Sequence, residues 1–265
     1  MSEQSSQSIP AEDRVPVHPV LWIMVAVMVG FEVVFAAADT GWLPDWLGRS
    51  HFYYRFAFVD ALFDHALGTR VLDFPVAPMD ALRPHTLLTH AFLHGGWLHL
   101  ALNGAAFLGL GHALVQTIGI ARFLGIFALT AIAGALAFGF IAEAQGVMVG
   151  ASGALFGMIA VITAWQERAL RRAGLSRAPI WRRIAALVAL NVFLAIGLEG
   201  MLAWEAHLGG WVAGWLMALV IRPRFGPFSQ VPVDRAPDDR AAFDEAPRED
   251  LPDASRPAST LPPRS

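Results

Sequence analysis

Apolar residues of this chain gather in long runs that are separated by short polar stretches. Six of the runs approach the ~20 residues that an α-helix needs to cross a bilayer. They lie at about residues 19–38, 97–116, 121–142, 151–166, 184–203 and 204–221, the last two parted only by a turn near Gly200–Glu205. The pattern predicts an all-α membrane protein, a bundle of six transmembrane helices with a long outer loop after the first helix.

The composition supports a membrane location and narrows the function classes. Of the 265 residues, 55% are hydrophobic and 15% charged. In a soluble domain about a quarter are charged, so an ordinary cytosolic enzyme is excluded. The net charge of −3 excludes a dedicated nucleic-acid binder, which needs a basic face. The chain contains neither cysteine nor lysine, which excludes disulfides, thiol catalysis, cysteine metal sites and a lysine general base.

The arginines predict which helix ends face the cytoplasm. The connection between the fourth and fifth predicted helices contains a cluster of six: Arg168, Arg171, Arg172, Arg177, Arg182 and Arg183. The connections on the opposite side, around Glu143 and Glu199–Glu205, contain none. Because cytoplasmic loops are enriched in arginine, the arginine-rich connection is expected in the cytoplasm, and six spans then place both termini there. We expect an integral protein of a bacterial inner (plasma) membrane.

Three regions are predicted along the chain. Residues 1–18 form a short cytoplasmic N-terminus. A cleavable signal peptide begins with a basic region, whereas this segment is acidic, so the first helix is expected to be retained. Residues 19–223 form the six-helix domain. Residues 224–265 are rich in proline and mixed charge, which predicts a disordered cytoplasmic tail.

The predicted outer loop, residues 39–96, mixes aromatic and charged residues. That mixture is typical of short helices that lie in the membrane interface. The loop is either a folded cap without chemistry or a guide for another membrane-embedded chain.

Among the polar residues inside the predicted membrane helices, where lipid disfavours them, four stand out. They are His99, Asn103, Ser152 and His207. Taken singly, a serine can bond to its own helix carbonyl, and an asparagine or histidine can tie two helices together. Counted at about 1.5 Å per residue from the cytoplasmic ends of their helices, however, Asn103, Ser152 and His207 lie roughly 20–22 Å above that edge, and His99 lies one turn higher. Their common depth favours one shared site.

These residue types together point to nucleophilic catalysis. A serine becomes a good nucleophile when a base takes its proton, and His207 can act as that base for Ser152 at neutral pH. His99 and Asn103 are four residues apart and share a helix face, so both can donate hydrogen bonds to one oxyanion. Glu205 is two residues from His207 and points to a different face, so no acidic third member is assigned.

Glycines indicate how the helices of the serine and the histidine meet. Each carries two glycines four residues apart, a spacing that lets membrane helices approach closely. The pairs are Gly153 with Gly157, and Gly210 with Gly214. Gly150, two residues before the serine, permits a tight entry into its helix.

At these residues the chain resembles the rhomboid family of intramembrane serine proteases. The resemblance covers about residues 84–220 and the preceding span. It rests on three motifs: His90-Ala91-Phe92-Leu93-His94-Gly95-Gly96-Trp97-Leu98-His99 running into Asn103, Gly150-Ala151-Ser152-Gly153, and Ala206-His207-Leu208-Gly209-Gly210 with Gly214.

The resemblance implies a six-helix core, a catalytic dyad of Ser152 and His207, and an oxyanion hole made by His99, Asn103 and the Ser152 backbone N–H. The implied substrates are single-pass or multi-pass membrane proteins, cleaved within or beside their transmembrane segments near the outer surface. The partners are therefore these substrates and the lipid bilayer, without nucleic acid, cofactor or metal.

The chain departs from the family pattern at two places. The family often has a Trp-Arg pair before the histidine-rich stretch, where this chain has His85-Thr86, and this puts the anchoring of the outer loop in doubt. Some members place a tyrosine that stacks on the catalytic histidine one turn after the serine. The residue here is Phe156, whose ring can still stack.

Other functions are possible on the sequence alone. His90 and His94 could share a metal, but zinc peptidases pair such histidines with an adjacent glutamate, and no acidic residue lies between Asp80 and Glu143. A non-catalytic rhomboid-like membrane-protein binder or chaperone is the main alternative, although such proteins usually lack the serine or the histidine. A transporter would show polar residues along a path through the membrane. Glu32, an acid inside the first span, has no assigned role.

Overall fold

The computed structural model describes residues 15–73, 75, 77, 81, 83–142, 146–197 and 202–224. All of them belong to one unit of the chain, Met1–Val231. Most of the predicted N-terminal segment, residues 1–14, and nearly all of the predicted tail, residues 225–265, lie outside the described residues.

Long helices cover the six segments for which the sequence predicts spans. They are α1 (Pro19–Asp39), α6 (Trp97–Ile118), α7 (Ile120–Ile141), α8 (Ser152–Arg172), α9 (Ala178–Gly197) and α10 (Trp204–Val220). Helix α1 begins with proline, which suits the first helical position, and the His18 ring accepts the Val20 N–H at 3.3 Å. Gly119, with φ +82°, forms the tight turn between α6 and α7, since glycine adopts positive φ without steric cost.

Two helix boundaries differ from the prediction. Helix α8 continues to Arg172, beyond the predicted end at residue 166, and α9 begins at Ala178 rather than at 184. Apolar runs mark where a helix is buried in lipid, whereas alanine, leucine, glutamate and arginine extend helices equally well in a polar layer. The described part of α9 ends at Gly197, residues 198–201 lie outside the described residues, and residues 202–203, where the fifth span was predicted to end, are not helical.

Four of the described helices, α1, α6, α7 and α9, are long and apolar enough to cross a membrane. Length and composition therefore confirm four of the six predicted spans. Helix α10 has 17 residues, and the second half of α8 is charged. Most of the first half of α8 is buried among its neighbours, so this helix does not need the uniform apolar surface that lipid contact demands.

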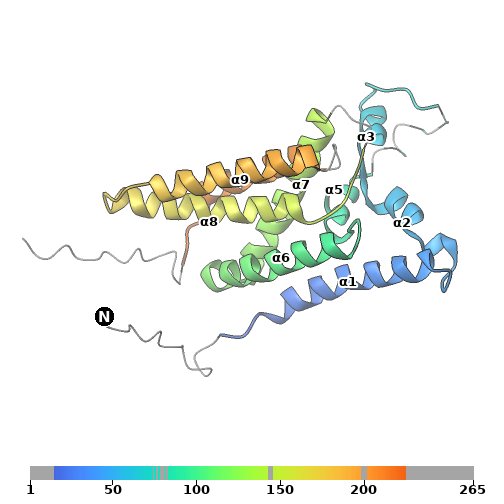
Figure 1. Cartoon of the computed structure of the whole chain (residues 1–265). Helices are drawn as coiled ribbons and strands as arrows, with labels where there is room; N and C mark the ends of the chain where they lie inside the picture. The colour runs from blue at the N-terminus through green and yellow to red at the C-terminus, as the bar shows by residue number, and fades with distance from the viewer. Residues whose placement is uncertain are drawn as a thin grey trace, which may run out of the picture. The chain divides into compact units, whose positions relative to one another are not determined.

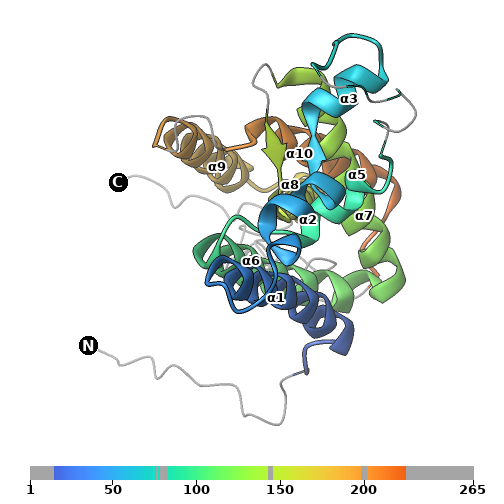
Figure 2. The ribbon, with the colours of Figure 1, turned by 90° about the vertical axis from the view of Figure 1, so that its right-hand side faces the viewer.

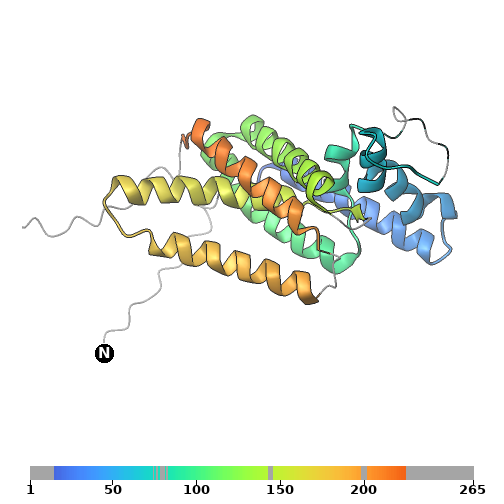
Figure 3. The same ribbon diagram turned by 90° about the horizontal axis from the view of Figure 1, so that it is seen from above.

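The bundle is organised around α8, which packs most extensively against α10 and also contacts α7 and α6. Helix α1 lies beside α6 on the outside of that group (Figure 1). Buried aromatic rings fill the space between α6 and α7, with Phe107 packed edge-on against Phe123 and Phe127. Helix α9 runs along the edge of the bundle (Figure 3) and has one buried residue, Ile180.

The described residues between α1 and α6 form short elements at one end of the bundle (Figure 1), the end that faces the viewer in Figure 2. They are η2 (Asp45–Leu47), α2 (Arg49–Phe56), β1 (Phe58–Val59), α3 (Asp60–Ala66), α5 (Thr86–Thr89) and η3 (His90–Phe92). Strand β1 pairs antiparallel with β2 (Val147–Met148), and Phe58 lies opposite Met148. This pairing ties the segment between α1 and α6, called the outer segment below after the predicted outer loop, to the stretch that leads into α8.

His85 and Thr86, which stand where the rhomboid family often has a Trp-Arg pair, make anchoring contacts of their own. The ring of His85 bonds to the Arg55 carbonyl at 2.7 Å, and the Thr86 hydroxyl donates to the Arg83 carbonyl at 2.7 Å. Thr89 donates to the Phe56 carbonyl at 2.7 Å. The bonds of His85 and Thr89 hold α5 against the end of α2, so this segment is anchored without a tryptophan or an arginine at positions 85 and 86.

Candidate active site

Ser152 is the first residue of α8 and follows a turn that depends on a glycine. Gly150 has a φ of +111°, a conformation that favours glycine. Its N–H donates to the His90 carbonyl at 2.9 Å, so the outer segment fixes the turn. At a helix start the backbone N–H groups are unpaired and the dipole is positive, which suits a nearby developing negative charge.

The side chains of Ser152 and His207 meet across the contact between α8 and α10. The serine Oγ lies 2.8 Å from Nε2 of the histidine. This contact joins residues that are 55 positions apart in the chain. It is the geometry that a general base needs to take the hydroxyl proton.

The glycine pairs of α8 and α10 interlock in register and make this contact possible. A Cβ added at Gly210 would overlap the carbonyl of Gly153, and one added at Gly214 would overlap the carbonyl of Gly157. The two backbones therefore touch at successive turns, just below the serine and the histidine. The close approach predicted from the spacing is confirmed.

Two further side chains hold the ring of His207. Phe156 stacks on it with a centroid distance of 4.2 Å and an interplanar angle of 7°, so the stacking expected of Phe156 is confirmed. Asn191 Oδ1 lies 2.6 Å from Nδ1. Because a carbonyl oxygen only accepts, Nδ1 carries the hydrogen, and Nε2 keeps its lone pair for the serine proton.

Asn191 was missed by the sequence analysis, which assigned no third partner to the histidine. The signal was available, since a polar amide inside an apolar helix is costly. A helix start at residue 184 would put Asn191 too near the predicted cytoplasmic end. It lies 13 residues after the observed start at Ala178, roughly 20 Å along the helix. The correct helix start places it at the depth of the other site residues. Glu205 is not the partner of Nδ1.

His99 and Asn103 lie beside the turn that precedes Ser152. A Cβ added at Gly150 would be 2.7 Å from Nε2 of His99 and 3.9 Å from Nδ2 of Asn103. Asn103 donates one N–H to the His99 carbonyl at 3.0 Å, and its amide has a second N–H to offer. The structure thus brings the four residues singled out by depth around one turn of backbone.

A cavity of about 640 Å³ lies beside the histidine, between α9 and α10. Its wall is mostly apolar and includes Leu187, Val192, Ile196, Trp204 and Leu208, while Asn191 and His207 contribute polar atoms. Such a cavity suits apolar side chains or a short unwound apolar segment rather than a charged ligand.

His90 and His94, considered above as a metal pair, make separate contacts. His90 Nδ1 bonds to the Thr86 carbonyl at 2.9 Å, and burial lowers its pKa to about 4. His94 packs edge-on against His99 with a centroid distance of 5.1 Å. Within the described residues, no three histidine, aspartate or glutamate side chains gather as a metal ion would require.

The fold and site define a helical membrane protein in which a serine of one inner helix, α8, is within hydrogen-bond distance of a histidine of another, α10. Residues 82–224, more than half of the chain, match the Rhomboid domain. The chain belongs to the rhomboid family, as its motifs predict.

Named relatives agree with that assignment. The chain is 32% identical over 151 residues to RHOMBOID-like protein 1 of Arabidopsis thaliana, a match that covers 54% of this chain and 36% of the relative. It is 31% identical over 149 residues to RHOMBOID-like protein 5 of the same plant, covering 53% and 45%. A Bacillus subtilis (strain 168) protein named "Putative rhomboid protease YdcA" is 31% identical over 134 residues, covering 51% and 65%. The matches thus span less than two thirds of these relatives.

Proposed function

We propose that this protein is an intramembrane serine endopeptidase that cleaves transmembrane segments of other membrane proteins near the outer membrane surface. The observation that carries the proposal is the 2.8 Å contact between Ser152 Oγ and His207 Nε2, with Asn191 on the other ring nitrogen. A non-catalytic binder would have no need to hold a serine, a histidine and an amide in this order.

The geometry supports a two-step acyl transfer. His207 Nε2 takes the proton as Ser152 Oγ attacks the scissile carbonyl, and the resulting imidazolium protonates the departing amine. Water, activated by the same histidine, then releases the acyl group from the serine. Asn191 holds the imidazole in the tautomer that accepts the serine proton and stabilises the ring when it is charged.

The oxyanion formed in each step needs hydrogen-bond donors. His99, the second N–H of Asn103 and the backbone N–H of Ser152 are the proposed donors, since both side chains border the turn at Gly150. Donors fixed before the reaction stabilise the developing charge without reorganisation.

The proposed substrate is a membrane protein whose helix unwinds readily. A peptide bond in a regular helix is shielded, and lipid offers no partners for backbone groups that are freed by unwinding. Glycine costs about 1 kcal/mol and proline about 3 kcal/mol in a helix interior relative to alanine. We therefore expect cleavage near small or helix-breaking residues, with apolar side chains received beside His207.

The proposed orientation places the connection between α8 and α9 in the cytoplasm, together with both termini, and Ser152 toward the outer face. The arginine cluster of this connection lies at the end of α8 opposite to Ser152. At the same end the Trp165 indole donates to the Ile221 carbonyl at 2.8 Å. The Bacillus relative, whose name contains "rhomboid protease", agrees with the proposed activity.

Labelling with a serine-directed fluorophosphonate probe tests the proposal directly. The purified protein in detergent is expected to bind the probe covalently at Ser152, as mapped by mass spectrometry. Ser152→Ala should abolish labelling, whereas Ser176→Ala, which removes an exposed serine before α9, should leave it unchanged. Equal labelling of wild type and Ser152→Ala would overturn the proposal.

A further inference from the structure

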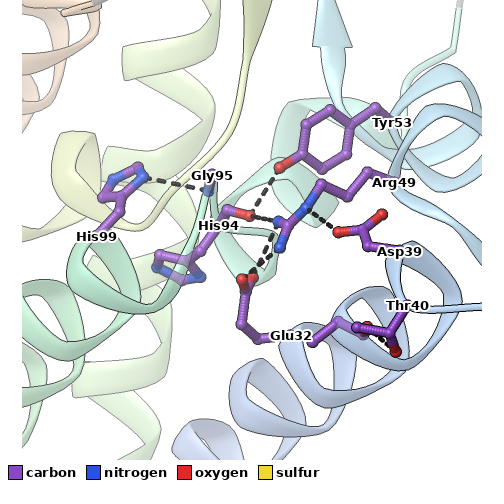
Figure 4. A network of polar contacts seen from close by, with 9 residues as sticks. Glu32, Asp39, Thr40, Arg49, Tyr53, His94, Gly95 and His99 are labelled. Carbon is purple, nitrogen blue, oxygen red and sulfur yellow. Dashed lines mark hydrogen bonds and ion pairs between the residues drawn. The ribbon is translucent and has the colours of Figure 1, made fainter.

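Side chains form hydrogen bonds with both the carbonyl and the N–H of the peptide group between His94 and Gly95 (Figure 4). Its carbonyl oxygen accepts from Arg49 Nη1 at 2.9 Å and from the Tyr53 hydroxyl at 2.7 Å. Its N–H, on Gly95, donates to Nδ1 of His99 at 3.3 Å. Because the peptide is a rigid plane, holding the carbonyl also aims the N–H.

Arg49 is itself held in place by a buried acid from the middle of α1. Glu32 is 1% exposed, and its two oxygens lie 2.6 Å and 3.2 Å from the two terminal nitrogens of the guanidinium. The bond to Glu32 raises the pKa of Arg49 above its usual value, so the arginine stays charged. Since a buried charge without a partner is strongly unfavourable, this pair fixes the guanidinium against the His94 carbonyl.

The bond from Gly95 decides which nitrogen of His99 carries a hydrogen. A backbone N–H can only donate, so Nδ1 of His99 must accept, and in a neutral imidazole the hydrogen then lies on Nε2. Nε2 is the nitrogen beside Gly150. A cationic donor on the carbonyl also strengthens the N–H of the same peptide, because hydrogen bonds in a chain polarise one another.

His94 keeps the ring of His99 from turning. The two rings pack edge to face at 5.1 Å. Burial lowers the pKa of His94 to about 3, so at neutral pH this neighbour brings no positive charge toward His99. The ring plane and the tautomer of His99 are therefore both set by the stretch His94–Gly95.

We propose that Arg49, held by Glu32, is a positioning residue for catalysis: through the His94–Gly95 peptide it keeps His99 in the Nε2–H form, aimed at the oxyanion. This inference rests on the proposed function and assigns a role to Glu32. It differs from simple anchoring of the outer segment, because anchoring alone does not require a particular tautomer of His99.

The test measures the tautomer and the kinetics in the same set of variants. In protein labelled with ¹⁵N-histidine, the imidazole ¹⁵N shifts report which nitrogen is protonated, and the His99 signal is identified by its absence in His99→Gln. Wild type should show the Nε2–H form alone. Arg49→Gln should show a mixture of tautomers, with kcat lowered about 10-fold, less than the roughly 10²–10³ lost with an oxyanion donor, and KM within about twofold of wild type.

Matched variants keep the proposal falsifiable. Asp39→Asn removes the charge of the exposed partner of Arg49 Nε, 3.2 Å away, and should leave the tautomer and kcat unchanged. Arg49→Lys, which retains the charge, should recover part of the loss. If Arg49→Gln does not fold, Tyr53→Phe removes the other donor to the same carbonyl and should lower kcat with a smaller tautomer change.

Two results would overturn the positioning role. In one, Arg49→Gln (or Tyr53→Phe in its place) keeps full activity. In the other, kcat falls while His99 stays entirely in the Nε2–H form, as a merely structural anchor would predict. Failure of the proposed function is seen separately, as an unlabelled and inactive wild type, because the tautomer is measured without turnover.

Discussion

Asn191 Oδ1 accepts a hydrogen bond of 2.6 Å from Nδ1–H of His207, and this bond ties the peripheral helix α9 to the centre of the bundle. Ile180 is the one buried residue in the described part of α9, and near the start of the helix Arg183 donates to Gln166 of α8. The position of α9 is therefore linked to the orientation of the histidine. A displaced α9 would leave Nδ1 without this partner.

Asn191→Ala should lower kcat with little change in KM, because Asn191 acts on the base rather than on substrate. A typical hydrogen bond contributes about 1 kcal/mol, so the expected loss is roughly fivefold or more. Steady-state cleavage of a transmembrane substrate in detergent measures it. Leu190→Ala, a neighbouring residue that is 49% exposed, is the matched control and should be neutral. A variant with wild-type kcat would show that Asn191 only ties α9 to α10.

Asn103→Ala tests the proposed oxyanion site. Loss of one donor typically costs roughly 10²–10³ in rate, about 2.7–4 kcal/mol. Weak activity should remain, since His99 and the Ser152 N–H are still present. The single-turnover rate is the measurement of choice. Nearly full turnover would mean that Asn103 serves only to bond the His99 carbonyl.

Gly210→Ala should destabilise the protein and abolish activity, because the new methyl group would overlap the Gly153 carbonyl and separate α8 from α10. Overpacking of this kind costs roughly 1–3 kcal/mol. Gly125→Ala on α7 is the control, since nothing lies within 4 Å of the added carbon there. Unfolding in increasing dodecyl sulfate compares the two variants. Equal stability of both variants would contradict the close backbone contact.

The orientation can be tested because the chain has no cysteine. A cysteine placed at Trp42, which is 87% exposed, should react with a membrane-impermeant thiol reagent from outside intact cells. One placed at the exposed Ser176 should react only after the cells are opened. The reverse pattern would overturn the proposed topology.

Much of the site could be predicted because it depends on two regular quantities. The rise per residue of a helix puts Asn103, Ser152 and His207 at one depth, and the four-residue glycine spacing brings α8 against α10. Neither quantity depends on knowing the loops. The observed contact between Ser152 and His207 follows from both together.

The remaining site residues could not be predicted for reasons that are equally physical. Asn191 was hidden by the position of the α9 start, because polar arginines continue a helix beyond the apolar run. The pairing of Glu32 with Arg49, 17 residues away, requires that α2 fold back over the end of α1. Hydrophobic periodicity does not encode that return, so Glu32 was left without a role.

Cleavage by reconstituted protein tests the proposed activity most directly. Wild type, Ser152→Ala, His207→Ala and the exposed-serine control Ser176→Ala are placed in liposomes with a substrate whose transmembrane helix contains glycine or proline, and the products are sized by mass spectrometry. Wild type and Ser176→Ala should cut the substrate near the outer end of its helix, while the other two, folded as judged by circular dichroism, should leave it intact. Equal cleavage by wild type and Ser152→Ala, or an intact substrate with every protein, would contradict a serine endopeptidase.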